Sequence, residues 1–143
     1  MNDNILNLHY EIDAEDFSSA GEASSNVKKT LKSLGISPEI VKKVAIAMYE
    51  AEINAVIHAD GGFADVTISS ESIKVVISDH GPGIPNISLA MQEGWSTASE
   101  TVREMGFGAG MGLPNMKRYT DEMYVKSTVG VGTEVTLIVN IKQ

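Results

Sequence analysis

The segment from Glu39 to Ala59 is the longest and most apolar helix that the sequence predicts, and it most constrains the fold. Ser37-Pro38 is typical of a helix start, with a serine N-cap and proline at the first helical position. Asp60-Gly61-Gly62 ends the helix. A helix this apolar must bury its side chains, so the rest of the chain has to cover it.

The remaining segments are predicted to form a sheet and further helices. Strands are expected at 5–12, 63–69, 72–78, 123–129 and 133–141, and helices at 16–34 and from 113 to about 122. Residues 84–110 show no sustained period apart from one short helix around 88–92. This order predicts an α+β fold, a two-layer α/β sandwich with helices on one face of a mostly antiparallel sheet.

Length and composition narrow the class of protein. A chain of 143 residues suits a single domain, here residues 1–143. It contains no cysteine, which excludes disulfides, thiolate metal sites and a cysteine nucleophile. It shows neither a signal peptide nor an apolar run of about 20 residues, so we expect no membrane span and a cytoplasmic protein. A net charge of −8 disfavours nucleic acid as a partner.

Three separate motifs carry the chemistry, and the first is a polar stripe on the long helix. Glu50, Asn54 and His58 fall within an arc of about 80° at 100° per residue. A solvated helix edge would explain each of them taken alone. A functional interpretation gives the Asn54 amide oxygen to Mg²⁺ and makes Glu50 a base for a hydroxyl or water. For His58 the pattern favours a supporting or structural role.

The second motif follows the strand at 72–78. Asp79 stands where this strand ends, and the chain then turns through Gly81-Pro82-Gly83. A carboxylate in this place can accept a hydrogen bond from the exocyclic amine of adenine, and glycines let the backbone approach a flat base. An ordinary Asp/Gly/Pro turn is the alternative.

The third motif is a run of alternating glycines at 106, 108, 110 and 112. Its spacing fits neither a Walker A loop nor a dinucleotide fingerprint. Glycines in this pattern before a helix leave amides free to wrap phosphates, which a strongly acidic chain needs if it is to bind ATP. A flexible hinge is the alternative, and a lid would be both.

Together these motifs resemble the N, G1 and G2 boxes of the GHKL (Bergerat) ATPase superfamily of gyrases, chaperones, histidine kinases and mismatch-repair proteins. The run through Gly-Met-Gly-Leu-Pro-Asn-Met-Lys-Arg is similar to one family within it, the bacterial anti-sigma-factor serine/threonine kinases, including the stressosome switch kinase. The resemblance covers about residues 13–139.

The resemblance implies a role for each matching residue. Glu50 corresponds to the catalytic base and Asn54 to the magnesium ligand. The residues that correspond to the ATP-binding positions are Asn54, Asp79, Gly81, Gly83, Arg103, Gly108, Gly110, Met111, Gly112 and Thr133. Among these, Asp79 would bind adenine with support from Thr133, and Arg103 takes the place of a lid arginine that reaches the γ-phosphate. Residues 84–112 would form a mobile lid over the nucleotide.

The implied function is an ATP- and Mg²⁺-dependent protein serine/threonine kinase. Its substrate would be a STAS-domain anti-anti-sigma protein, and some family members also bind a sigma factor or activate a phosphatase. A homodimer is possible. Two alternatives stay open: a binding module gated by nucleotide without kinase activity, and the catalytic domain of a histidine kinase, which is disfavoured because the chain has no helical hairpin carrying a phosphoacceptor histidine.

Overall fold

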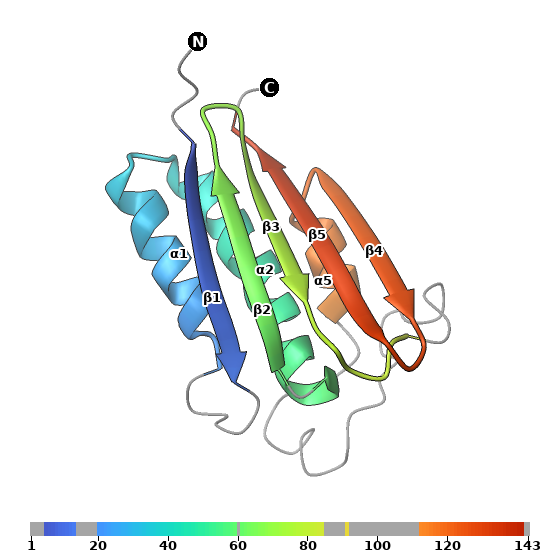
Figure 1. Ribbon diagram of the computed structural model, residues 1–143. Coiled ribbons are helices and arrows are strands. Elements are labelled where there is room, and N and C mark those ends of the chain that lie inside the picture. The colour runs from blue at the N-terminus through green and yellow to red at the C-terminus, as the bar shows by residue number, and fades with distance from the viewer. Residues whose placement is uncertain (1–4, 14–19, 60, 85–90, 92–111, 142–143) are drawn as a thin grey trace, which may run out of the picture.

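A computed structural model describes residues 5–13, 20–59, 61–84, 91 and 112–141 of the chain. These residues form one five-stranded sheet and three helices (Figure 1). The strands are β1 (Leu6–Asp13), β2 (Gly61–Ile68), β3 (Ser72–Ser78), β4 (Glu122–Thr128) and β5 (Gly132–Asn140). The helices are α1 (Glu22–Ser33), α2 (Pro38–Ala59) and α5 (Gly112–Arg118).

The sheet has the strand order β1-β2-β3-β5-β4, and every neighbouring pair is antiparallel. All three helices lie behind the sheet in Figure 1 and cover the same face. The core between the two layers includes Leu31 of α1, Met48 of α2, Ile73 of β3, Met116 of α5 and Leu137 of β5, each at most 2% exposed. The predicted α+β sandwich is therefore confirmed.

Most predicted boundaries agree with the structure to within two residues. The strand at 72–78 is found where it was expected, and the long helix begins one residue earlier, at Pro38. The prediction for α1 was wrong at its start, because Ala20 and Gly21 form a turn and the helix begins at Glu22. The last helix was also predicted too long. It ends at Arg118, and by Asp121 the chain is already hydrogen-bonded to β5, from the Asp121 amide to the Ile138 carbonyl at 2.9 Å.

The expected short helix around 88–92 lies, apart from Met91, outside the described residues. Of the helices that the structure describes, none has the length and hydropathy that a membrane crossing requires.

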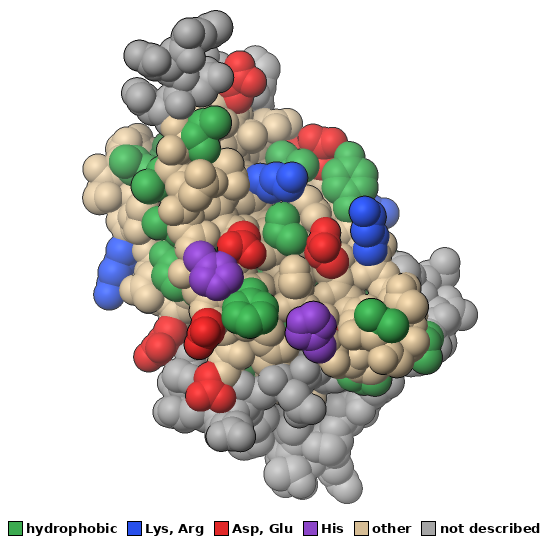
Figure 2. Space-filling model, viewed as in Figure 1, with side chains coloured by type: hydrophobic (Ala, Val, Ile, Leu, Met, Phe, Trp, Pro, Cys, Tyr) green, Lys and Arg blue, Asp and Glu red, His purple; other side chains and the backbone are tan. Residues whose placement is uncertain are grey.

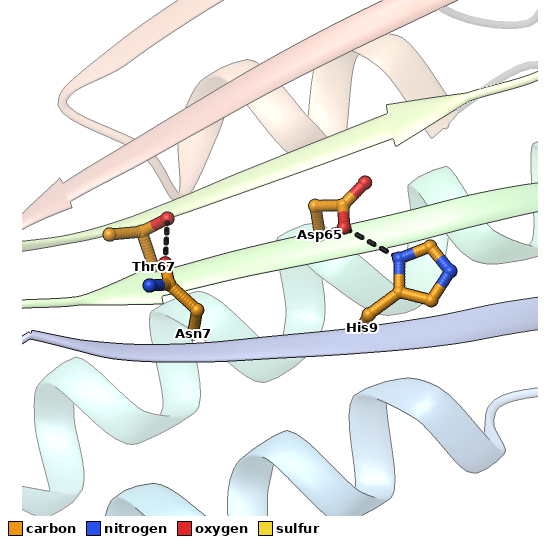
Figure 3. Close-up of polar contacts among 4 residues, drawn as sticks. All are labelled: Asn7, His9, Asp65 and Thr67. Carbon is orange, nitrogen blue, oxygen red and sulfur yellow. Dashed lines mark hydrogen bonds and ion pairs between the residues drawn. The ribbon is translucent and has the colours of Figure 1, made fainter.

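The face of the sheet opposite the helices carries polar side chains paired across strands. His9 Nδ1 lies 2.6 Å from Asp65 Oδ1, and Thr67 Oγ1 donates to Asn7 Oδ1 at 3.1 Å (Figure 3). The His9 ring also stacks on Phe63, with 5.5 Å between ring centroids. Figure 2 shows this face as a mixture of charged, histidine and scattered apolar side chains. These cross-strand pairs support the register between β1 and β2 from the solvent side.

Helix α1 has no capping side chain of its own, and a carboxylate from α2 takes that place. Gly21 at the N-cap has a φ of 96° and no side chain to offer. Glu52, only 3% exposed, accepts hydrogen bonds from the amides of Gly21 (2.9 Å), Ala23 (3.2 Å) and Ser24 (3.0 Å). A buried carboxylate is stable only with such partners, so Glu52 joins α1 to α2.

Glu52→Ala should therefore destabilise the fold. The substitution leaves three backbone amides at the start of α1, those of Gly21, Ala23 and Ser24, without their acceptor. The free energy of unfolding should therefore fall by about 2–4 kcal/mol in urea titrations. Glu39→Ala is the control, because Glu39 is an exposed acid in the first turn of α2, the helix that also carries Glu52. This substitution should lower the free energy of unfolding by less than about 1 kcal/mol. Equal losses in the two variants would contradict a structural role for Glu52.

Candidate nucleotide site

Helix α2 brings Glu50 and Asn54 to one stripe, one helical turn apart. Both side chains are half-buried, whereas the neighbouring Ala51 and Ala55 are buried in the core. The stripe thus lies at the border between the core and the outside of α2. The backbone of His58 continues the same helix, and its side chain lies outside the described residues.

Helix α5 packs directly against this stripe through a glycine. A methyl group placed on Gly112 would stand 2.9 Å from both Nδ2 and Oδ1 of Asn54. Such distances are shorter than van der Waals contact, so only glycine lets the backbone come this close to the Asn54 amide. The end of the glycine-rich motif and the first motif, 58 positions apart in sequence, therefore meet at Asn54.

Glu50 is the acid of this stripe, and its surroundings alter its pKa. Burial raises its pKa above the ordinary value for a glutamate, and a hydrogen bond from the Asn115 side chain of α5 partly offsets this effect. A carboxylate with a raised pKa is a stronger base than an exposed one, and it still has a partner to orient it.

The second motif is folded around Asp79. Its Oδ1 accepts hydrogen bonds from the amides of Gly81 at 2.9 Å and Thr133 at 3.0 Å. The Asp79 amide in turn donates to the Thr133 carbonyl at 2.9 Å. Both of these bonds to the side chain go to Oδ1, and among the described residues none reaches Oδ2. Asp79, Gly81 and Thr133, which the sequence analysis named together, are therefore joined by hydrogen bonds, and their role in binding adenine stays a prediction.

The turn after Asp79 is held against the hairpin between β4 and β5. Gly83 has a φ of +80°, and a methyl group there would stand 2.6 Å from the Thr128 carbonyl oxygen. The Gly130 amide donates to the Pro82 carbonyl at 2.8 Å. Ser127 Oγ accepts from the Ile84 amide at 2.6 Å and lies 2.9 Å from Thr133 Oγ1.

The motifs gather at one end of the sheet. Helix α2 ends there and the chain enters β2 at Gly61, while Gly62 lies directly against Ser78 and Asp79 at the end of β3. Strand β5 begins at the same end, with Gly132 against the backbone of Asp79. In Figure 1 the ends of α2 and β3 and the beginnings of α5 and β5 lie together at the lower edge of the sheet. The described residues of the three motifs, the third represented by Gly112 alone, therefore share one neighbourhood.

Four of the predicted site residues, Arg103, Gly108, Gly110 and Met111, lie outside the described residues. Conversely, the sequence analysis did not assign a role to Asn115 or Ser127. Ser127 is one polar residue in an alternating strand, and no pattern distinguishes it. Asn115 follows Pro114 in a helix start, where a polar residue is ordinary, and only its three-residue offset from Gly112 could have pointed to it.

Comparisons with known proteins find relatives of this chain. The family described as the histidine kinase-like ATPase domain matches residues 14–139. The chain is 31% identical over 115 residues to the serine/threonine-protein kinase RsbT of Bacillus subtilis, covering 78% of this chain and 80% of that protein. It is 35% identical over 104 residues to an anti-sigma F factor of a Thermoanaerobacter species, covering 69% of each.

A solved structure shows the same fold at low sequence identity. The RsbU and RsbW domains of a Mycobacterium tuberculosis protein match with a TM-score of 0.63 and 16% identity, over 94% of this chain and 32% of that longer chain.

Gly112→Ala should weaken binding of Mg²⁺-nucleotide. The added methyl group would push the Asn54 amide out of its place, and we expect an affinity loss of about tenfold in calorimetry with Mg²⁺-ADP, about 1.4 kcal/mol. Lys117→Ala, on the exposed side of the same helix, should bind as tightly as the wild type. Undiminished binding by Gly112→Ala would show that the contact with Asn54 plays no part in nucleotide binding.

Proposed function

The chain belongs to the histidine kinase-like ATPase family, within the group that contains RsbT and the anti-sigma F factors, and we propose that it is an ATP-dependent protein serine/threonine kinase. The observation that carries the proposal is the junction of α2 with α5. There a half-buried glutamate with a raised pKa lies one turn from an asparagine amide that is packed against Gly112.

The described residues fit ATP and Mg²⁺. The Asp79 Oδ2 can accept the exocyclic amine of adenine, because Gly81 and Thr133 occupy only Oδ1. Asn54 offers a neutral oxygen of the kind that Mg²⁺ accepts alongside phosphates and water. Among the described residues there is no cluster of three or more acidic or histidine side chains that would hold a metal by itself. A single amide ligand suits a Mg²⁺ ion that is bound mainly by the nucleotide.

When bound, ATP supplies the γ-phosphoryl group, and this chain would position the reactants. Glu50 would accept the proton of a serine or threonine hydroxyl on the protein substrate. As it does so, the oxygen of that hydroxyl bonds to the γ-phosphorus, and the bond between the γ-phosphorus and the leaving ADP breaks. The carboxylate is suited to this role because burial moves its pKa toward neutral pH, which makes it a stronger base. Asn54, and the glycines 108, 110 and 112, would hold the metal and phosphates.

We propose a STAS-domain anti-anti-sigma protein as the substrate, with regulation of a sigma factor by partner switching as the outcome. The support is the group of relatives, which are named as a serine/threonine kinase and as anti-sigma factors. The net charge of −8 favours a partner with a basic contact surface. The proposal places the protein in the cytoplasm, where transcription is regulated, and a homodimer stays a prediction.

A second candidate is a nucleotide-gated anti-sigma or switch module without kinase activity. The relatives named as anti-sigma factors favour it, since that name describes binding of a partner and not phosphate transfer. The half-buried Glu50 favours the kinase instead, because carboxylates whose pKa is raised by burial are concentrated at catalytic sites.

Transfer of labelled γ-phosphate from ATP to STAS-domain proteins of the same organism tests the kinase. Glu50→Gln should lose at least about 100-fold of the rate, the usual contribution of a general base, and still bind ADP. Asp79→Asn should instead lose ADP affinity, because an amide NH₂ would meet the amine of adenine. Tight ATP binding without transfer to any candidate would favour the binding module, and full activity of Glu50→Gln would refute the assigned base.

The pH dependence of transfer provides a separate test of Glu50. A base acts only when ionised, so the rate at saturating ATP should fall as the pH is lowered through the pKa of Glu50. Because burial raises that pKa, the midpoint of the fall should lie above the ordinary glutamate value of 4.5. The residual rate of Glu50→Gln should lack this limb, and an identical profile in both proteins would assign it to another group.

A further inference from the structure

The contact between Glu50 and Asn115 joins the proposed base to a helix that begins at the end of the glycine-rich motif. The Asn115 side chain is the hydrogen-bond partner that lowers the pKa of Glu50, and both side chains are half-buried. Helix α5 runs opposite to α2 in Figure 1 and meets it where Gly112 contacts Asn54, which places Asn115 next to Glu50. Glu50 is an acceptor when ionised, so the Asn115 amide is the donor. A neutral donor stabilises the carboxylate without a positive charge that would compete for the phosphates.

The contact between Asn115 and Glu50 is the second of two contacts that join α5 to the polar stripe of α2. Gly112 packs on Asn54, and three residues later Asn115 reaches Glu50, four residues earlier on α2. Steps of three and four residues each advance about one helical turn along a face. The two helices therefore run past each other in opposite directions with one register. The metal-binding and base positions of α2 each have their own partner on α5.

Among the described residues, burial and Asn115 are the influences that shift the pKa of Glu50, and no ionised side chain contributes. A half-buried carboxylate without a counter-charge depends on its hydrogen bonds for both orientation and ionisation. Within the described part of the chain, Asn115 is the side chain that is paired with this carboxylate.

We propose that Asn115 is a positioning residue that holds the Glu50 carboxylate toward the hydroxyl of the protein substrate. This inference rests on the proposed kinase function and deepens it. It makes the geometry of the base depend on the placement of α5 against α2, and so on the helix whose first residue, Gly112, belongs to the predicted phosphate-wrapping segment. Asn115 itself contacts neither nucleotide nor substrate in this proposal.

Single-turnover phosphate transfer by three variants at position 115 and 117 tests the inference. Asn115→Ala should slow transfer about 10- to 100-fold, the scale expected for a misdirected reacting group, with the Kd for Mg²⁺-ADP changed less than about twofold. Asn115→Asp keeps the size of the side chain but has no N–H, so it should be as slow at neutral pH. Lys117→Ala should transfer at the wild-type rate.

A double-mutant cycle shows whether Asn115 acts through Glu50. In a Glu50→Gln background, Asn115→Ala should change the residual rate by less than about twofold, because no carboxylate is left to orient. An equal loss in both backgrounds, full activity of Asn115→Asp, or a loss of ADP affinity parallel to the loss of rate would each overturn the inference.

A measurement without substrate separates this inference from the proposed function. The carboxyl carbon of Glu50, followed by NMR in the nucleotide-free protein, should titrate at a higher pH in Asn115→Ala than in the wild type, because the lost donor had stabilised the ionised form. An unchanged titration would overturn the role of Asn115. Absence of transfer by the wild-type protein would instead refute the kinase function.

Discussion

Burial of helix α2 against the sheet, with α1 and α5 packed on either side of it, is the interaction on which the rest of the structure depends. The helix contacts α1, α5 and strands β1, β2, β3 and β5. Many of its apolar residues, among them Val44 and Met48, are almost fully buried. A helix enclosed in this way cannot rotate without loss of packing, because protein interiors are close-packed. Any side chain at the border of its buried face is therefore held in a defined direction.

Three carboxylates on or near this helix, Glu52, Glu50 and Asp79, differ in their burial and in their hydrogen-bond partners. Glu52 is almost fully buried, and its partners are three amides of α1, so it serves the fold. Glu50, two residues earlier and about 200° around the helix, is half-buried with one neutral partner, and its pKa is raised. Asp79 has one oxygen engaged by the backbone. Burial and hydrogen-bond partners together distinguish the three acids.

Close backbone approaches at glycine place the site as firmly as hydrogen bonds do. Gly112 lies against Asn54, Gly132 against Asp79, and Gly83 against the end of β4. At each of these positions a side chain would have to displace backbone atoms or the Asn54 amide. The glycines thus have a second role beside the backbone freedom for which such residues are usually noted, since they let elements distant in sequence meet around one site.

The sequence by itself determined the strands, the long helix and the members of the three motifs, because periodicity and turn residues act over short stretches of chain. It also indicated the family, through Glu50, Asn54, Asp79 and the alternating glycines. Only the tertiary structure decided where α1 begins, since its cap is Glu52 from another helix. Likewise, only the packing of α5 on α2 brought Asn115 to Glu50, and only the sheet brought Thr133 to Asp79. These contacts join residues far apart in the chain, and no local pattern records which partner a buried polar group will meet.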